Sequence, residues 1–414
     1  MDLRPNDHAT LLLTAHLPND GPLQPLAPGE WSRFSAWLKG QGIAPSDLFV
    51  GDPRHTLAAF QDKSVTLERL LPLLDRGAQI GFLLDKWQRA GLWVITRSSP
   101  DYPMLLQERL GDGSPPLFYG AGDRKKLDTK ALAVVGSRNA GEEDLHFARQ
   151  LGHSAAQQGW SIVSGGARGV DEASMRGAIE AQGTVIGVVA DSLLKTANSF
   201  KYRDAIQRSD IVLLCPYHPE SGFSGPNAMS RNKHVYCLSR AAVVVCSDAG
   251  KGGTWAGANE DLKKKWVPLW VKHQADLRSG NRALVERGAL VLPDVNPHVL
   301  RMEELEHGSL SNNELFAGQP AEANEPVATY EKPKQAPPLK SNGMARPSDA
   351  DDMEAVLKAL TTPMTDKALA KHLDMTLERI NKLLEHLIHL HKVEPPVGRK
   401  KSYKLAAPDL FSTG

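Results

Sequence analysis

The fold is decided by Ala131-Leu-Ala-Val-Val-Gly-Ser-Arg-Asn139 and Ser161-Ile-Val-Ser-Gly-Gly-Ala-Arg-Gly-Val-Asp171. Each stretch is a short apolar run that ends in a turn of small residues and an arginine, and a helical pattern follows each turn. An apolar run without alternation is typical of a parallel strand that helices cover on both faces. The two stretches therefore predict consecutive strand–helix units of a doubly wound, Rossmann-like α/β sheet.

The two turns also predict an anion site, because the carboxyl ends of parallel strands meet at one edge of the sheet. Glycine lets the backbone approach a phosphate, the N–H groups of a helix N-terminus point at it, and arginine adds a bidentate partner. The residues that we expect to bind phosphate in these turns are Gly136, Ser137, Arg138, Ser164, Gly165, Gly166 and Arg168.

Both arginines also have a structural interpretation. Arg138 would form a salt bridge at the rim of the sheet, and Arg168 would pair with Asp171 or Glu172 to brace the second turn. Asp171 is expected to be a helix N-terminal residue that orders the loop, and a catalytic carboxylate is the alternative for it.

Two later segments extend the predicted site. Arg231-Asn232-Lys233 follows a loop rich in glycine and proline, residues 222–227, and loops next to basic residues often bind ligands. We expect this segment to contact phosphates or bases, and the alternative for Asn232 is to hold the loop through backbone hydrogen bonds. Gly252-Gly253-Thr254 precedes another expected helix and would form a third anion-binding turn.

These motifs, in this order, resemble those of the DprA/Smf family. The resemblance covers residues 93–293 well and includes the run from Asp101 to Gly120, which looks like the segment before the first strand in that family. It implies a DNA-binding protein that protects incoming single-stranded DNA in natural transformation (competence), loads a RecA-type recombinase for DNA recombination and forms a homodimer. Gly252-Gly253-Thr254 stands where the family usually has Ser-Gly-Ser, and residues 190–195 replace its Gly-Leu-Asp turn, so the chain is identified as a divergent member.

Changes of composition along the chain predict four regions. Residues 1–92 have helical spacing of apolar residues, and the resemblance implies a SAM-like or helix-hairpin-helix domain there. Residues 93–307 are expected to form the Rossmann-like DprA domain. Its candidate strands are residues 132–135, 161–163, 184–189, 211–215, 242–246, 266–270 and 290–292. Residues 308–349 are rich in proline and poor in apolar residues, which predicts a disordered linker.

Residues 350–414 are predicted to form a winged-helix domain. The apolar spacing from Leu369 to Leu387 fits a helix-turn-helix, and the segment after it is expected to form two strands around a basic tip. The residues of this tip that we expect to give accessory phosphate contacts are Arg399, Lys400 and Lys401. Mixed charge on the expected recognition helix leaves a protein-contact role as an equal alternative.

The composition of the whole chain limits the classes of function. The 414 residues carry a formal charge of +1, so a DNA-binding surface must be local. The three cysteines lie in or beside apolar runs without metal-ligand or disulfide spacing, which is typical of a reducing cytosol. The sequence shows neither a signal peptide nor a membrane-spanning run, so we expect a cytoplasmic protein without a membrane partner.

The leading hypothesis is a non-enzymatic protein that binds single-stranded DNA and needs no cofactor, no metal and no catalytic residue. The first alternative is a nucleotide-binding or nucleotide-hydrolysing protein like the LOG phosphoribohydrolases, including a sensor in a defence pathway. Glu260 is the candidate carboxylate for that reaction, but its spacing from Gly252-Gly253-Thr254 is late. A winged-helix transcription regulator is the second alternative.

Overall fold

The computed structural model describes residues 3–17, 20–273 and 280–309, and in the C-terminal part residues 355–360, 364–373, 375–389, 393–397 and 402–405. Chain contacts separate two compact units, whose described parts lie within residues 3–309 and 355–405. Of the predicted linker, residues 308–349, only the first two residues are described. The boundaries of the four predicted regions therefore stay predictions.

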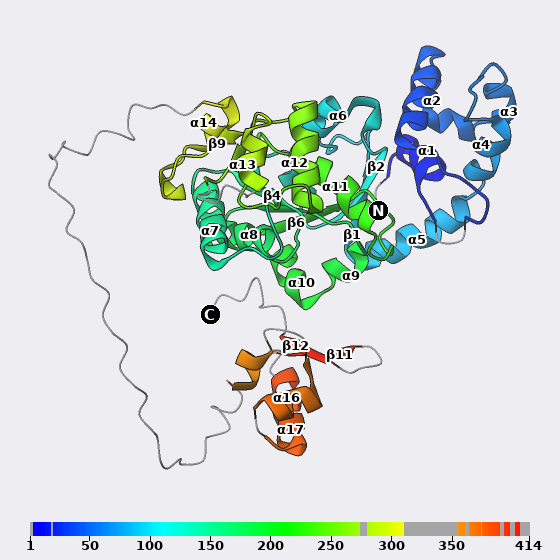
Figure 1. Ribbon diagram of the computed structural model, residues 1–414. Helices are drawn as coiled ribbons and strands as arrows, with labels where there is room; N and C mark the ends of the chain where they lie inside the picture. Colours follow the sequence, from blue (N-terminus) through cyan, green and yellow to red (C-terminus); the bar gives the residue numbers. More distant parts are fainter. Residues whose placement is uncertain are drawn as a thin grey trace, which may run out of the picture. The chain divides into compact units, whose positions relative to one another are not determined.

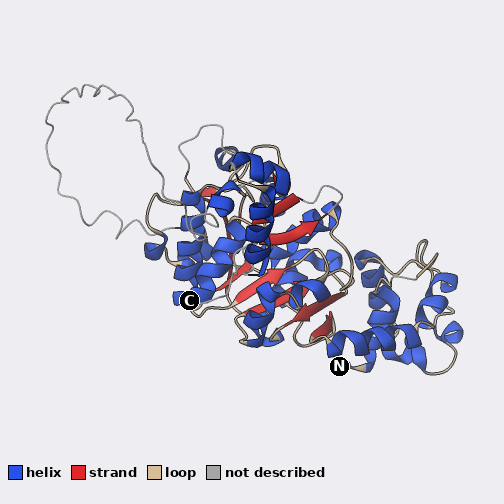
Figure 2. Ribbon diagram, turned by 90° about the horizontal axis from the view of Figure 1, so that it is seen from below, coloured by secondary structure: helices blue, strands red, loops and turns tan. Residues whose placement is uncertain are grey.

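A nine-stranded sheet forms the centre of the first unit (Figures 1 and 2). Its strand order is β1-β2-β6-β5-β4-β3-β7-β8-β9, and all neighbours from β6 to β9 run parallel. The strands are β1 (Leu92–Thr96), β2 (Leu117–Ala121), β3 (Ala131–Val135), β4 (Ser161–Ser164), β5 (Val185–Val188), β6 (Ile211–Cys215), β7 (Ala241–Val244), β8 (Leu269–Val271) and β9 (Leu290–Val291). The predicted α/β sheet, mostly parallel, is thus confirmed, and each candidate strand overlaps one of β3 to β9.

The first two strands were not expected from the sequence. β1 pairs antiparallel with β2, and β2 pairs antiparallel with β6. The run from Asp101 to Gly120 thus contains most of β2, and it precedes β3, the first of the strands that the sequence predicted. All five residues of β2 are buried, but no helical pattern of a βα unit follows directly, so the alternation of strands and helices did not reveal it.

Helices cover both faces of the sheet, as Figure 2 shows. Helices α7 (Glu142–Gln157) and α8 (Val170–Glu180) share a core with Leu132 and Val134 of β3. Helices α11 (Gly225–Cys237) and α12 (Gly252–Lys264) share the other core with Ala131 and Ala133 of the same strand. Successive residues of a strand point to opposite faces, so β3 contributes to both cores.

Five helices precede the sheet, and two of them, α1 and α5, contact its first strands (Figure 1). They are α1 (Pro5–Thr14), α2 (Pro28–Gly40), α3 (Pro53–Thr56), α4 (Leu67–Leu74) and α5 (Gly77–Arg89). Leu12 of α1 and Trp87 of α5 belong to the same core as Tyr119 of β2. The helical region therefore packs directly on the antiparallel edge of the sheet, while its assignment as a SAM-like or helix-hairpin-helix domain stays a prediction.

Shorter elements complete the first unit. The α-helices are α6 (Met104–Leu110), α9 (Leu193–Ala197), α10 (Phe200–Gln207), α13 (Gly280–Val285) and α14 (Met302–His307), and the 3-10 helices are η1 (Pro45–Phe49), η2 (Gly111–Gly113), η3 (Arg124–Leu127) and η4 (Pro297–Val299). Across the described parts of both units, no helix combines the length and the apolar character that crossing a bilayer requires.

The second unit contains helices and a small antiparallel sheet. Its elements are β10 (Met364–Thr365), α16 (Asp366–His372), α17 (Leu377–His389), β11 (Val393–Val397) and β12 (Ser402–Leu405), in the strand order β10-β12-β11. Thr365 caps α16 by accepting a hydrogen bond from the Ala368 N–H group. The winged-helix assignment stays a prediction, and the predicted basic tip, Arg399, Lys400 and Lys401, lies outside the described residues.

The strand order places a ligand crevice between β3 and β7. From β3 the chain adds β4, β5 and β6 in one direction, and then returns to add β7, β8 and β9 in the other. The connections that follow β3 and β7 consequently diverge at the carboxyl edge of the sheet. Open α/β sheets bind ligands at such a switch point.

Candidate nucleic-acid interface

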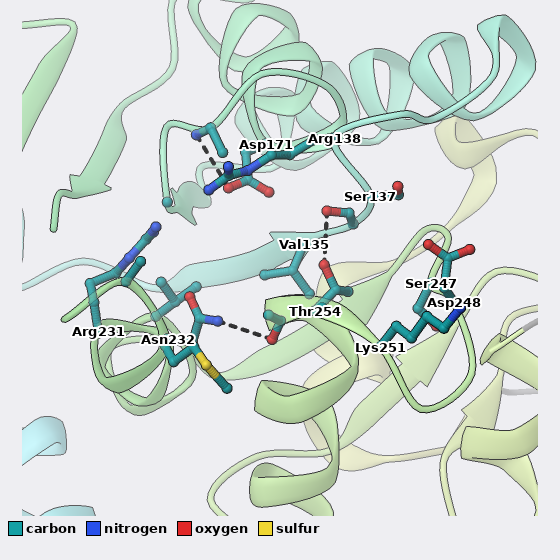
Figure 3. Close-up of a pocket in the computed structure, with 18 of the residues that line it drawn as sticks. Val135, Ser137, Arg138, Asp171, Arg231, Asn232, Ser247, Asp248, Lys251 and Thr254 are labelled. Carbon is teal, nitrogen blue, oxygen red and sulfur yellow. Dashed lines mark hydrogen bonds between the residues drawn. The ribbon is translucent and has the colours of Figure 1, made fainter. Parts of the chain in front are cut away.

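A pocket of about 410 Å³ lies at this switch point (Figure 3). It is formed by the turns after β3, β4 and β7, by the loop before α11 and one side of that helix, and by the first turn of α12. The sequence-predicted residues that line it are Gly136, Ser137, Arg138, Gly165, Arg231, Asn232, Gly252, Gly253 and Thr254. Four segments that are distant in the sequence thus meet at one site.

The turn after β3 is held tightly against its neighbours. The Ser137 N–H group donates a hydrogen bond to the Cys246 carbonyl oxygen at 3.0 Å, and the Thr254 hydroxyl donates to the Gly136 carbonyl oxygen at 2.9 Å. Gly136 has no room for a side chain, because a Cβ atom there would overlap the side chain of Val170. The turn is therefore a fixed platform for the residue that follows it.

Arg138 extends from this platform as an exposed side chain (Figure 3). Among the described residues it has no ion-pair partner, so the salt bridge at the sheet rim is not seen there. An exposed guanidinium on a rigid turn is available to an anion that enters the pocket.

The turn after β4 is occupied by the protein's own carboxylate. The Ala167 N–H group donates to Asp171 Oδ2 at 3.4 Å, and Asp171 is buried. Burial raises the pKa of Asp171, while the charge of Arg231 and the N–H groups of Ala167 and Gly165 oppose that shift. Asp171 therefore orders this loop from the N-terminus of α8, and the turn contributes fewer open N–H groups to a ligand than its glycines suggest.

Three predicted residues of the second turn do not line the pocket. Ser164 is buried and its hydroxyl donates to the Val134 carbonyl oxygen at 2.7 Å. Gly166 has φ +67° and its carbonyl oxygen faces the Tyr202 hydroxyl. Arg168 is exposed and donates to Asn139 Oδ1 at 3.3 Å.

The alternative for Arg168, an ion pair with Asp171 or Glu172 that braces the turn, is also not seen, because both carboxylates have other partners. Glu172 pairs with Lys201 at 3.1 Å, and the carboxylate of Asp171 accepts from the turn itself.

Arg231 is the buried cation of the pocket, with a relative exposure of 7%. Its guanidinium lies directly over Gly165, where any side chain would collide with it. Burial lowers the pKa of Arg231, the carboxylate of Asp171 opposes this shift, and the charge of Arg138 adds to it. Arg231 Nε is buried without a hydrogen-bond partner. The charge and the hydrogen-bond donors of Arg231 are thus only partly matched within the protein, and an anion in the pocket would supply the missing acceptor.

The two residues after Arg231 have different roles. Asn232 Nδ2 donates to the Gly253 carbonyl oxygen at 3.0 Å, so Asn232 holds the first turn of α12 in place. Lys233 does not line this pocket and instead lines a second cavity.

The N-terminus of α12 has no side-chain cap. Lys251 occupies the N-cap position, and its side chain makes no capping hydrogen bond to the first turn of Gly252, Gly253 and Thr254. The first N–H groups of an α-helix have no partner within the helix and carry positive partial charge. They line the pocket together with the exposed side chain of Lys251, which adds a full charge at the rim.

Several residues that line the pocket were not among the predicted site residues. Lys251 and Asp248 are exposed after β7, and Phe223 and Met229 are 65% and 54% exposed around the start of α11. An aromatic residue inside the Gly- and Pro-rich loop was the available signal for Phe223. Lys251 directly precedes the Gly252-Gly253-Thr254 turn, so its position at a helix N-cap could have been inferred.

The carboxylates do not match the LOG-like alternative. Glu260 does not line the pocket, and the carboxylates that do are Asp171 and Asp248. No cluster of three metal-ligating side chains occurs among the described residues, and Cys215, Cys237 and Cys246 are buried free thiols.

Comparison with known proteins agrees with the resemblance in the motifs. The family model described as DNA recombination-mediator protein A matches residues 93–303, just over half of the chain. The DNA processing protein DprA of Bacillus subtilis is 28% identical over 218 residues, covering 51% of this chain and 70% of that protein. A DprA relative in Mycobacterium tuberculosis is 30% identical over 193 residues, but the chain spans only 49% of its length.

A solved structure supports the same assignment at the level of the fold. The X-ray structure of DprA from Streptococcus pneumoniae has a TM-score of 0.52 at 19% identity, covering 70% of this chain and 95% of that one. With the family model matching the sheet and all four segments of the pocket, the chain belongs to the DprA/Smf family of DNA-processing proteins.

Proposed function

We propose that the pocket between β3 and β7 binds the phosphate backbone of single-stranded DNA, and that the protein is a non-enzymatic DNA-binding protein. The observation that carries this proposal is the convergence of Arg138, Arg231 and the uncapped N-terminus of α12 on one recess. Each of the three groups favours an anion, and together they match the repeated charges of a nucleic-acid backbone.

The preference for a single strand rests on the exposed apolar residues at the pocket. Phe223 and Met229 are more than half exposed beside the phosphate-binding groups. Unpaired bases stack on such side chains, whereas the bases of a duplex are already stacked on each other. A recess of about 410 Å³ also suits one backbone better than the width of a duplex.

Membership of the DprA/Smf family supports a wider role. In this proposal the protein protects single-stranded DNA, delivers it to a RecA-type recombinase during DNA uptake and recombination, and acts as a homodimer. The C-terminal unit is proposed to be an accessory winged helix, whose Arg399, Lys400 and Lys401 add phosphate contacts or whose surface contacts a protein.

The test is fluorescence anisotropy with a labelled 20-nucleotide oligo-dT and a duplex of equal length, at several salt concentrations. Tighter binding of the single strand, with affinity that falls as salt rises, supports the proposal. Equal affinity for both forms, or an affinity independent of salt, contradicts it. Turnover of free nucleotides by the same preparation would favour the LOG-like alternative.

A further inference from the structure

A second cavity, of about 460 Å³, lies on the other side of α11. It is enclosed by the end of α1, the residues before α2, strand β2, the turn after β6 and one face of α11. Arg231 and Asn232 face the first pocket, whereas Ser230, Lys233 and His234 line the second. Its size falls within the range of roughly 300–1,000 Å³ that is usual for small-ligand sites.

Buried polar groups in this cavity lack partners. The Tyr119 hydroxyl and His218 Nε2 are buried and have no hydrogen-bond partner, and their residues are 2% and 8% exposed. The ring nitrogens of His234 are also buried without a partner. About nine in ten buried polar groups in proteins are hydrogen-bonded, so this cluster offers a ligand in the cavity several hydrogen-bonding groups that no protein atom uses.

These groups are neutral hydrogen-bonding groups. His218 Nδ1 accepts a hydrogen bond from the Glu220 N–H group at 3.2 Å, and burial lowers the pKa of the ring. The neutral ring therefore carries its proton on Nε2 and offers a donor there. Burial, together with the nearby charges of Lys233 and Arg231, lowers the pKa of His234 to about 3, so this ring is also uncharged.

The walls between the polar groups are apolar and include several proline rings. Leu26, Leu117, Pro28, Pro116 and Pro216 line the cavity. Apart from its histidines, Lys233 is the only basic side chain among the described residues that line it, and no carboxylate lines it. A matching ligand has apolar faces, hydrogen-bond acceptors on its edge and a negative charge at one end.

We propose that this second cavity binds a nucleobase, with the phosphate of the nucleotide directed to Lys233. Carbonyl oxygens of the base accept hydrogen bonds from Tyr119 and His218, and the faces of the base pack against the prolines. The base belongs either to a free nucleotide or to a strand whose phosphates occupy the first pocket. In the second case the inference rests on the proposed function, because α11 would then bind phosphate on one face and base on the other.

The first experiment titrates the full-length protein with deoxythymidine monophosphate, thymidine and inorganic phosphate by isothermal calorimetry. We expect the nucleotide to bind more tightly than thymidine and inorganic phosphate to bind least. Tyr119→Phe should weaken nucleotide binding about 3- to 10-fold, as expected for one lost hydrogen bond. Because the hydroxyl has no partner in the unliganded protein, this variant should melt at or above the wild-type temperature.

The matched control is Tyr202→Phe, which removes another buried hydroxyl but lines neither cavity. It should leave nucleotide affinity unchanged. Lys233→Gln provides a second, independent variant, and it should weaken binding of the nucleotide but not of thymidine. No nucleotide binding, or equal binding by wild type, Tyr119→Phe and Lys233→Gln, would overturn the proposal and leave water as the occupant.

The second experiment identifies the source of the base and uses labelled oligo-dT with the same variants. If the base comes from the strand, Tyr119→Phe weakens oligonucleotide binding, and if it comes from a free nucleotide, oligonucleotide affinity stays constant while nucleotide affinity falls. Failure of the proposed function gives a different result, in which Arg138→Ala leaves the affinity for the oligonucleotide unchanged. The calorimetric comparison of wild type with Tyr119→Phe still tests the second cavity in that case.

Discussion

Replacing Arg138 by alanine gives the sharpest test of the first pocket. The side chain is exposed, lines the pocket and has no ion-pair partner among the described residues, so its removal leaves no buried charge behind. Its platform remains, because Ser137 and Gly136 are held by hydrogen bonds of the backbone and of Thr254. We therefore expect Arg138→Ala to fold normally and to lose affinity for single-stranded DNA.

The size of the effect follows from the cations of the pocket. Arg138, Arg231 and Lys251 line it, and each neutralised phosphate of a single strand contributes about −0.7 to the slope of log affinity against log salt. The pocket should thus contribute a slope of about −2, and the variant should lose about 0.7 of it. A charge-assisted hydrogen bond at an exposed site is worth about 1.4 kcal/mol, which corresponds to about tenfold in affinity.

The assay measures the fluorescence anisotropy of labelled oligo-dT between 50 and 200 mM salt. The control variant is Arg89→Ala, which changes the net charge by the same amount. The Arg89 side chain is 79% exposed on α5 and lines neither cavity. Equal losses for the two variants would mean that net charge, not the pocket, binds the strand. An unchanged salt slope in Arg138→Ala would refute the phosphate contact itself.

Three further predictions follow from the contacts of single residues. Gly165→Ala should weaken oligo-dT binding about tenfold in the same assay, because the new methyl group displaces the Arg231 guanidinium, and unchanged affinity would contradict that role of Gly165. A chain shortened after His307 should keep most of its single-strand affinity, since the pocket lies within residues 135–254, and loss of binding would assign the DNA site to the C-terminal unit. Asp261 is fully buried, and burial raises its pKa to about 7. The folded state therefore holds the proton of this carboxyl group more tightly than the unfolded state does. The stability that this gives is complete below about pH 4 and is lost as the pH rises to about 7. Asp261→Asn should therefore raise the free energy of urea unfolding relative to wild type at pH 8, by at most about 4 kcal/mol, and an equal difference at pH 5 and pH 8 would refute it.

The sequence was sufficient for the parallel part of the sheet, β3 to β9, and for much of the pocket, because both depend on local patterns. Apolar runs without alternation predict parallel strands, and the turns that follow parallel strands lie at one edge of the sheet whatever the rest of the chain does. Gly136-Ser137-Arg138 and Gly252-Gly253-Thr254 are such turns, and both line the pocket.

Other features depend on contacts that are distant in the sequence. The sequence suggested that Ser164 belongs to a phosphate-binding turn. In the structure it is the last residue of β4, and its hydroxyl donates to the Val134 carbonyl oxygen of β3. The N–H groups around Gly165 looked open, but Asp171 returns to them from α8. Strand β2 pairs with β6, nearly a hundred residues later, so no local pattern indicates it.

The segment Arg231-Asn232-Lys233 shows that neighbouring residues of a helix can face different cavities. The sequence predicted one basic group after a loop, whereas α11 begins at Gly225 and contains all three residues. Successive residues of an α-helix are rotated by about 100°, so residues two apart point to nearly opposite sides. Arg231 and Lys233 consequently line different cavities, and the second cavity becomes visible only when the helix is known.

The near-zero net charge of the chain makes this local organisation necessary. With 49 basic and 48 acidic residues, the protein has no general attraction for a polyanion, so affinity must come from cations that are held in place. Arg231 is held by burial beside Gly165 and Asp171, which lowers the entropy that it loses when an anion binds. The same burial has a cost in free energy while no anion is bound, and a phosphate that binds beside Arg231 would offset that cost. In the proposed function, a single strand gains its affinity from this one recess, in which the cations are already held in place.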